Sequence, residues 1–221
     1  LYVDETRPLE EFNADWTAAH EFSHLLLPYV SRSDRWLSEG LASYYQNVLR
    51  ARDGRLSQRE AWQKLVDGFE RGQKATQRES LREATAGGWE NVMRIYWSGA
   101  AMMLEADMRL RESSNGRQSL DTALGQLNGC CLQAGKLWSA RELLDKLDEL
   151  TDTSVFSAIF DENVESLTFP DVEESLNELG IIEQNGQVRL LSQAPLIDIR
   201  ESIMRGDPGD RSLSAVADNA P

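Results

Sequence analysis

Residues 20–24 read His20-Glu21-Phe22-Ser23-His24 and lie in a largely apolar stretch of the chain. The two histidines, the only ones among 221 residues, stand four positions apart. On an α-helix the side chains at i and i+4 share one face, so both imidazoles can reach a single Zn²⁺ while Glu21 points beside them. The pattern therefore predicts a metal site on a helix. On these five residues alone, a solvated helix face that binds nothing is the open alternative.

A catalytic zinc needs a third protein ligand, because such sites combine three protein donors with one position for water. The stretch Trp36-Leu37-Ser38-Glu39-Gly40 supplies a carboxylate on the next predicted helix, separated from His24 by fourteen residues. The apolar neighbours of Glu39 would turn it inward, so we expect it to complete the site. The alternative is an exposed glutamate in a first helical turn, where the helix dipole favours acids.

Hydrophobic periodicity and capping signals predict helices along most of the chain. The helix that carries the histidines is expected from Leu9 to Leu27, with Pro28 closing it. The next is expected from Arg35 to Arg52, where Asp53-Gly54 marks its end. Further helices are predicted at 57–72, 96–113, 119–133, 139–150, 153–161, 171–179 and 195–204.

One short sheet is predicted near the C-terminus. Asn185-Gly186 is a strong two-residue turn signal between two short apolar runs, and it predicts a β-hairpin. The fold class is therefore mainly α. We expect residues 1–180 to form a helical lobe that carries the zinc site, 181–206 to form the hairpin and a short helix packed on it, and 207–221 to form a disordered tail.

The net charge narrows the classes of partner that the chain is expected to bind. With 23 basic and 37 acidic residues the net charge is -14, which argues against nucleic acid and anionic membranes and is compatible with a peptide substrate. No stretch approaches the ~20 apolar residues that span a bilayer, so we expect a soluble protein. The chain starts at Leu1 without Met, which suggests a fragment or processed form. Removal of an upstream export signal would make it periplasmic or extracellular, and the compartment stays open.

Cys130 and Cys131 are adjacent in the sequence. Neighbouring cysteines seldom reach disulfide geometry with each other, so we expect two small buried apolar residues on a helix. A soft-metal site is the alternative, but no further cysteine or spare histidine exists to complete it.

Three segments together resemble the gluzincin zinc metallopeptidases, above all the glycyl aminopeptidase family and, in these motifs, the aminopeptidase N-like family. They are residues 20–24, 36–40, and 96–104, which begin Tyr96-Trp97-Ser98-Gly99-Ala100. The spacer before Glu39 is shorter than is usual in aminopeptidase N-like enzymes. The resemblance covers roughly residues 10 to 180 and implies the helical lobe of a thermolysin-like catalytic domain.

The resemblance also implies an activity, the zinc-dependent hydrolysis of peptide bonds in a peptide or protein substrate. The implied zinc ligands are His20, His24 and Glu39. Glu21 would act as general base toward water, and Tyr96 would stabilise the oxyanion. For Tyr96 the alternative is simple packing, which is common for tyrosine.

Several points stay open at the level of sequence. Relatives of the thermolysin type often place a carboxylate at the spacing of Ser43, to support a histidine ligand. In these families a β-rich part precedes the zinc helix and recognises the free amino terminus, whereas only nineteen residues precede His20. Such an upstream part is an implied partner, and the choice between aminopeptidase and endopeptidase is open. The competing hypothesis is a non-catalytic binding or regulatory lobe with a structural or relic metal site, closed by a fourth protein ligand.

Overall fold

The computed structural model describes residues 4, 6–132 and 135–206. The described residues form eleven α-helices and one two-stranded antiparallel hairpin, which confirms the predicted mainly helical fold. No helix among them is both long and apolar enough to cross a membrane. The first half contains α1 (Leu9–Ala14), α2 (Thr17–Ser23), α3 (Arg35–Arg52), α4 (Gln58–Lys74), α5 (Leu81–Ala86) and α6 (Val92–Ser113), with 3₁₀ turns at His24–Leu26, Arg32–Asp34 and Trp89–Asn91. The second half contains α7 (Leu120–Cys131), α8 (Ala140–Thr151), α9 (Val155–Asn163), α10 (Glu173–Glu178), β1 (Ile181–Gln184), β2 (Gln187–Leu190) and α11 (Ile197–Arg205).

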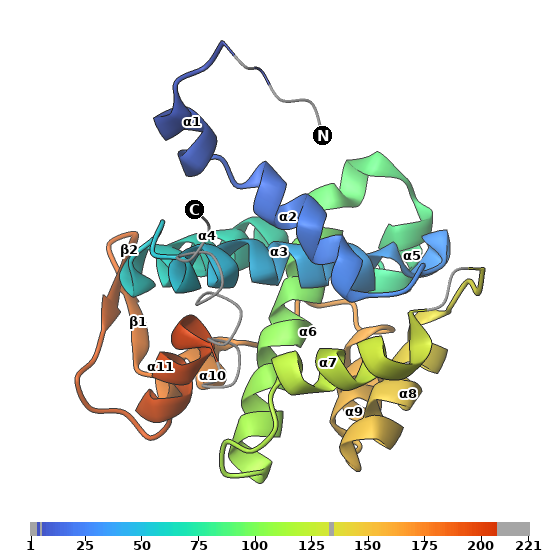
Figure 1. The fold of residues 1–221 in the computed structure, drawn as a ribbon. Helices are drawn as coiled ribbons and strands as arrows, with labels where there is room; N and C mark the ends of the chain where they lie inside the picture. The colour runs from blue at the N-terminus through green and yellow to red at the C-terminus, as the bar shows by residue number, and fades with distance from the viewer. Residues whose placement is uncertain (1–3, 5, 133–134, 207–221) are drawn as a thin grey trace, which may run out of the picture.

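The helices are arranged around α3 and α6, which cross each other (Figure 1). Helix α2 lies over α3, and α4 packs against both α3 and α6. The lower part of α6 carries α7, α8 and α9 on one side, whereas the hairpin, α10 and α11 lie on the other. Helix α2 therefore lies on one side of α3, opposite most of the core (Figure 1).

Helix α3 is the central element of the core. Its apolar side chains Leu37, Leu41, Tyr44 and Val48 recur at helical spacing and are buried. Burial of each such side chain stabilises the fold by about 1.5–3 kcal/mol. The opposite edge of the same helix faces α2, and so the core fixes which residues of α3 are presented there.

Two glycines allow α3 and α6 to approach closely where they cross. A Cβ atom built on Gly40 would lie 2.3 Å from the Cα atom of Gly99, and one built on Gly99 would lie 2.2 Å from the carbonyl oxygen of Trp36. Any side chain at either position would meet backbone, which cannot move aside as a flexible side chain can. Because Gly40 follows Glu39 and Gly99 is one turn after Tyr96, this crossing brings those two residues together.

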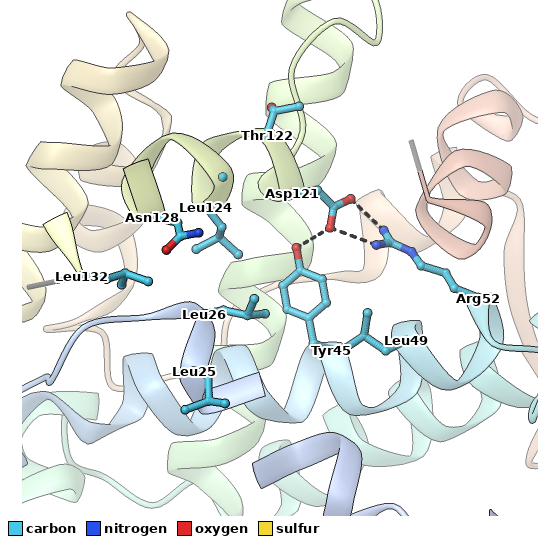
Figure 2. A pocket seen from close by; sticks show the side chains of 11 residues that line it. Leu25, Leu26, Tyr45, Leu49, Arg52, Asp121, Thr122, Leu124, Asn128 and Leu132 are labelled. Carbon is cyan, nitrogen blue, oxygen red and sulfur yellow. Dashed lines mark hydrogen bonds and ion pairs between the residues drawn. The ribbon is translucent and has the colours of Figure 1, made fainter. Parts of the chain in front are cut away.

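Paired charges tie α3 to α7 and lie within α6. The guanidinium of Arg52 donates two hydrogen bonds to Asp121, at 2.9 and 2.8 Å, and the hydroxyl of Tyr45 donates a third to the same carboxylate (Figure 2). Deeper in the core, Nε of Arg111 donates to Asp107 at 2.8 Å, and both side chains are 1% exposed. Each of these two arginines therefore has a carboxylate partner.

The prediction of one continuous helix from Leu9 to Leu27 is wrong, because the helical conformation is interrupted at Asp15. Asp15 is extended, with φ -70° and ψ 140°, and its carboxylate accepts a hydrogen bond from the backbone N–H of Thr17. This local bond starts a new helix and competes with continuation of the first one. Helix α2 then ends at Ser23, and a 3₁₀ turn carries the chain to Leu26, before Pro28.

Other boundaries follow the prediction more closely. Helix α3 has the predicted bounds, and the hairpin pairs Gln184 with Gln187 around the predicted Asn185-Gly186 turn. Helix α6 starts at Val92, four residues before the predicted start, and α5 was not predicted although Ser80 and Glu83 form its capping box. The proposed tail at 207–221 lies outside the described residues.

The expectation for Cys130 and Cys131 is wrong, because the two residues form a disulfide bond. They lie at the end of α7, where Cys130 is exposed and Cys131 is half-buried. Helix α7 ends at this pair, so the small ring that the disulfide bond closes lies where the backbone leaves helical geometry. They are not the buried apolar pair that the sequence suggested.

Candidate metal centre

Helices α2 and α3 bring the three predicted ligands together. Nε2 of His20 lies 3.3 Å from Oε2 of Glu39, and Nε2 of His24 lies 3.7 Å from the same oxygen. One donor atom from each of the three residues lies within 4.8 Å of the others, so the group could hold a metal ion. Donors about 2.1 Å from a tetrahedral zinc lie about 3.4 Å apart, which these spacings approach.

The composition of this group fits zinc. Two imidazoles and a carboxylate are borderline and hard donors of the kind that zinc takes in hydrolytic sites. Among the described residues no further histidine, cysteine, aspartate or glutamate joins the group. Three protein donors are the number found in catalytic zinc sites, whereas structural sites use four.

Each imidazole is held by a hydrogen bond at its other ring nitrogen. Nδ1 of His20 lies 2.9 Å from Oε1 of Gln46, and Nδ1 of His24 lies 2.9 Å from Oγ of Ser38. An amide oxygen only accepts, so a proton on Nδ1 of His20 satisfies this contact, and that tautomer leaves the lone pair of Nε2 for a metal. Both rings therefore present Nε2 toward Glu39.

Sequence analysis did not find these supporting residues. It considered Ser43, one turn beyond Glu39, whereas the support for His20 comes from Gln46, two turns beyond Glu39 on the same face of α3. The seven-residue spacing between Glu39 and Gln46 was a usable signal. Ser38 had none, because its role depends on how α2 lies across α3.

Electrostatics favours the protonation states that a metal requires. Burial lowers the pKa of His24 below its usual 6.5 although Glu39 and Glu21 act in the opposite direction. Burial alone raises the pKa of Glu39, but the neighbouring polar groups of His20, His24 and Tyr96 outweigh it, so the pKa of Glu39 lies below its usual 4.5. A neutral imidazole and an ionised carboxylate are the ligating forms.

Tyr96 reaches the centre from α6. Its ring stacks on that of His20, with centroids 5.8 Å apart and an interplanar angle of 17°, and Glu39 lies close enough for its charge to act on the hydroxyl. Burial first, and then the charge of Glu39, raise the pKa of Tyr96 well above 10. The phenol therefore stays protonated at neutral pH and is a hydrogen-bond donor beside the candidate ligands.

Glu21 borders the same group from α2. Its side chain is exposed, and its charge raises the pKa values of both His24 and Tyr96. It is not a member of the candidate ligand group. A carboxylate that is near the ligands and open to solvent has the position that a proton acceptor for water needs.

Comparison with known proteins agrees with the predicted resemblance. Residues 28–102 match the model of the M61 glycyl aminopeptidase family, a zinc metallopeptidase family. The match covers about a third of the chain, including Glu39 and Tyr96, and it begins after His24. The match therefore supports the residues that α3 and α6 contribute to the site, and it does not depend on the two histidines. No curated protein matches the chain.

Proposed function

We propose that this chain is the helical part of a zinc-dependent peptidase that hydrolyses peptide bonds. The observation that carries the proposal is the convergence of both Nε2 atoms on one carboxylate oxygen of Glu39, which itself lies in the segment that matches a peptidase family. Three donors rather than four support an enzyme over a structural or relic metal site.

Each residue would have a distinct role. Zinc, when bound by the three donors, supplies a Lewis acid that polarises the scissile carbonyl and lowers the pKa of water. Glu21 accepts a proton from the attacking water and returns it to the leaving amine, for which its exposed position beside the ligands is suitable. The protonated Tyr96 donates a hydrogen bond to the oxyanion of the substrate.

The substitution Glu21→Gln tests this assignment. After zinc is supplied and excess is removed, wild type and variant should hold the same amount of metal by elemental analysis. Only wild type should cleave a peptide mixture, and a chelator should abolish that cleavage. Glu10→Gln, at an exposed glutamate of α1, is the matched control and should behave as wild type.

Two results would contradict the proposal. A wild-type chain that holds no transition metal after loading removes its basis, and loss of metal in Glu21→Gln would make Glu21 a ligand. The termini of the products, read by mass spectrometry, separate trimming of amino termini from internal cleavage.

A further inference from the structure

A pocket of about 320 Å³ opens beside the candidate metal centre, between α3, α4 and α6. It shares Gln46 and Tyr96 with the centre, since both line the pocket and contact His20. The pocket and the centre are therefore adjacent, with Gln46 and Tyr96 between them. A peptide positioned at the centre could extend into this pocket.

The pocket is lined by cations in a chain of net charge -14. Arg50, Lys64 and Arg71 all line it, and no aspartate or glutamate among the described residues does so. None of the three has a carboxylate of the described chain within ion-pair distance, whereas Arg52, Arg109 and Arg111, for example, each have one. Arg71 instead lies over the ring of Trp97, 5.0 Å from its centroid.

Arg50 is the most unusual of the three, because it is buried without a counter-ion. It is 5% exposed, and one guanidinium nitrogen donates to the carbonyl of Ala14, while Nε has no acceptor in the described chain. The carboxylate of Asp15 influences Arg50 but is engaged at the start of α2. A buried cation normally has a paired carboxylate, as Arg111 has in Asp107. Here that partner is missing from the described protein groups.

We propose that this pocket binds a carboxylate of the peptide substrate, a few residues from the scissile bond. The inference rests on the proposed function for its position relative to cleavage. Gln46 and Arg50 lie seven and eleven residues beyond Glu39 on α3, which corresponds to about 10 and 16 Å. An extended peptide covers about 3.4 Å per residue, so the acid falls about three to five residues away.

A peptide series tests the pocket by binding as well as by cleavage. Ten-residue alanine peptides with a free amino terminus and an amidated carboxyl end would carry one Glu, or one isosteric Gln, at each position in turn. Binding to the zinc-loaded Glu21→Gln chain is measured by calorimetry, and cleavage by wild type is measured as kcat/KM. At one or two positions the Glu peptide should be favoured about tenfold or more over its Gln partner.

Substitutions in the pocket should remove that preference. Lys64→Gln combined with Arg71→Gln should bring the Glu-to-Gln ratio close to one, and Arg71→Glu should favour a Lys peptide instead. Both positions are exposed, so folding is expected to persist and is checked by circular dichroism. Lys74→Gln, which removes an exposed cation of α4 outside the pocket, is the control and should keep the tenfold ratio.

The source of the carboxylate is resolved by a second series of neutral peptides with free carboxyl ends and increasing length. A preference confined to this series assigns the pocket to the end of a short peptide rather than to an acidic side chain. Two results overturn the proposed carboxylate site. One is equal binding of Glu and Gln peptides at every position together with equal binding of free and amidated ends. The other is a Glu-to-Gln ratio that persists in the double variant. Acid-selective binding without zinc-dependent cleavage would instead overturn the proposed function and leave the pocket standing.

Discussion

The close crossing of α3 and α6 makes Gly99→Ala an informative perturbation of the site. The added Cβ would lie 2.2 Å from the carbonyl oxygen of Trp36, whereas ordinary contacts lie at 3.4–4 Å. The helices must therefore separate locally by roughly 1 Å. Overpacking of this kind lowers the free energy of unfolding by up to about 3 kcal/mol. The better helix propensity of alanine offsets about 1 kcal/mol of that loss. We expect a net loss of about 2 kcal/mol.

The same displacement should reach the candidate centre. Tyr96 lies one turn before Gly99, so a shift of α6 moves its hydroxyl away from Glu39. A misplacement of about 1 Å can cost about 100-fold in catalysis, so peptide cleavage should fall more steeply than stability alone explains. Urea unfolding at neutral pH gives the free energy of unfolding, and kcat/KM on a peptide substrate gives the second quantity.

Gly125→Ala in α7 is the matched control. Nothing lies within 4 Å of a Cβ atom at this position, so the variant should be unchanged or stabilised by up to about 1 kcal/mol. If Gly99→Ala proves as stable and as active as Gly125→Ala, the close crossing does not position the site, and the explanation offered for the two glycines is refuted.

Three further substitutions probe separate features. Gln46→Leu removes the acceptor at Nδ1 of His20, so zinc affinity in a competition titration should fall about 10- to 100-fold, and unchanged affinity would exclude a positioning role. Asp121→Asn leaves the guanidinium of Arg52 without its buried counter-ion and should cost about 3–5 kcal/mol in urea unfolding. The hydrogen bonds from its capping box lower the pKa of Glu142, so its stabilisation is complete above pH 4.5 and lost as pH falls through the lower folded-state pKa. Glu142→Gln should therefore flatten the loss of unfolding free energy on acidification, and an unchanged acid profile would exclude this contribution.

Local signals explain which parts of the fold were predictable. Helix α3 ends before Asp53-Gly54, and the hairpin turns at Asn185-Gly186, as predicted. Both were predictable because such residues determine the conformation of their own backbone. The break at Asp15 was missed since the apolar periodicity continues across it, although aspartate is a strong helix-start residue. The disulfide bond was missed because adjacent cysteines seldom reach disulfide geometry with each other. The division of the chain into a lobe and a C-terminal appendage stays a prediction.

The site divides in the same way. The candidate ligands were predictable because two spacings, one within a helix and one between neighbouring helices, indicate them. Arg50 was not, because its significance is that no carboxylate of the described residues lies within ion-pair distance of it, which is a property of the assembled fold. Arginine in a helix is unremarkable as sequence, and only its burial makes it a candidate binding residue.

The candidate centre combines contacts of very different sequence range. His20 and Glu39 are nineteen residues apart, so the loop that closes to join them is short and its entropy cost is modest. Tyr96 joins only when α6 docks across α3. Under the proposed function, a nascent or partly unfolded chain would assemble the candidate ligands before Tyr96 arrives, so the ability to hold a metal and the ability to use it would be acquired at two different stages of folding.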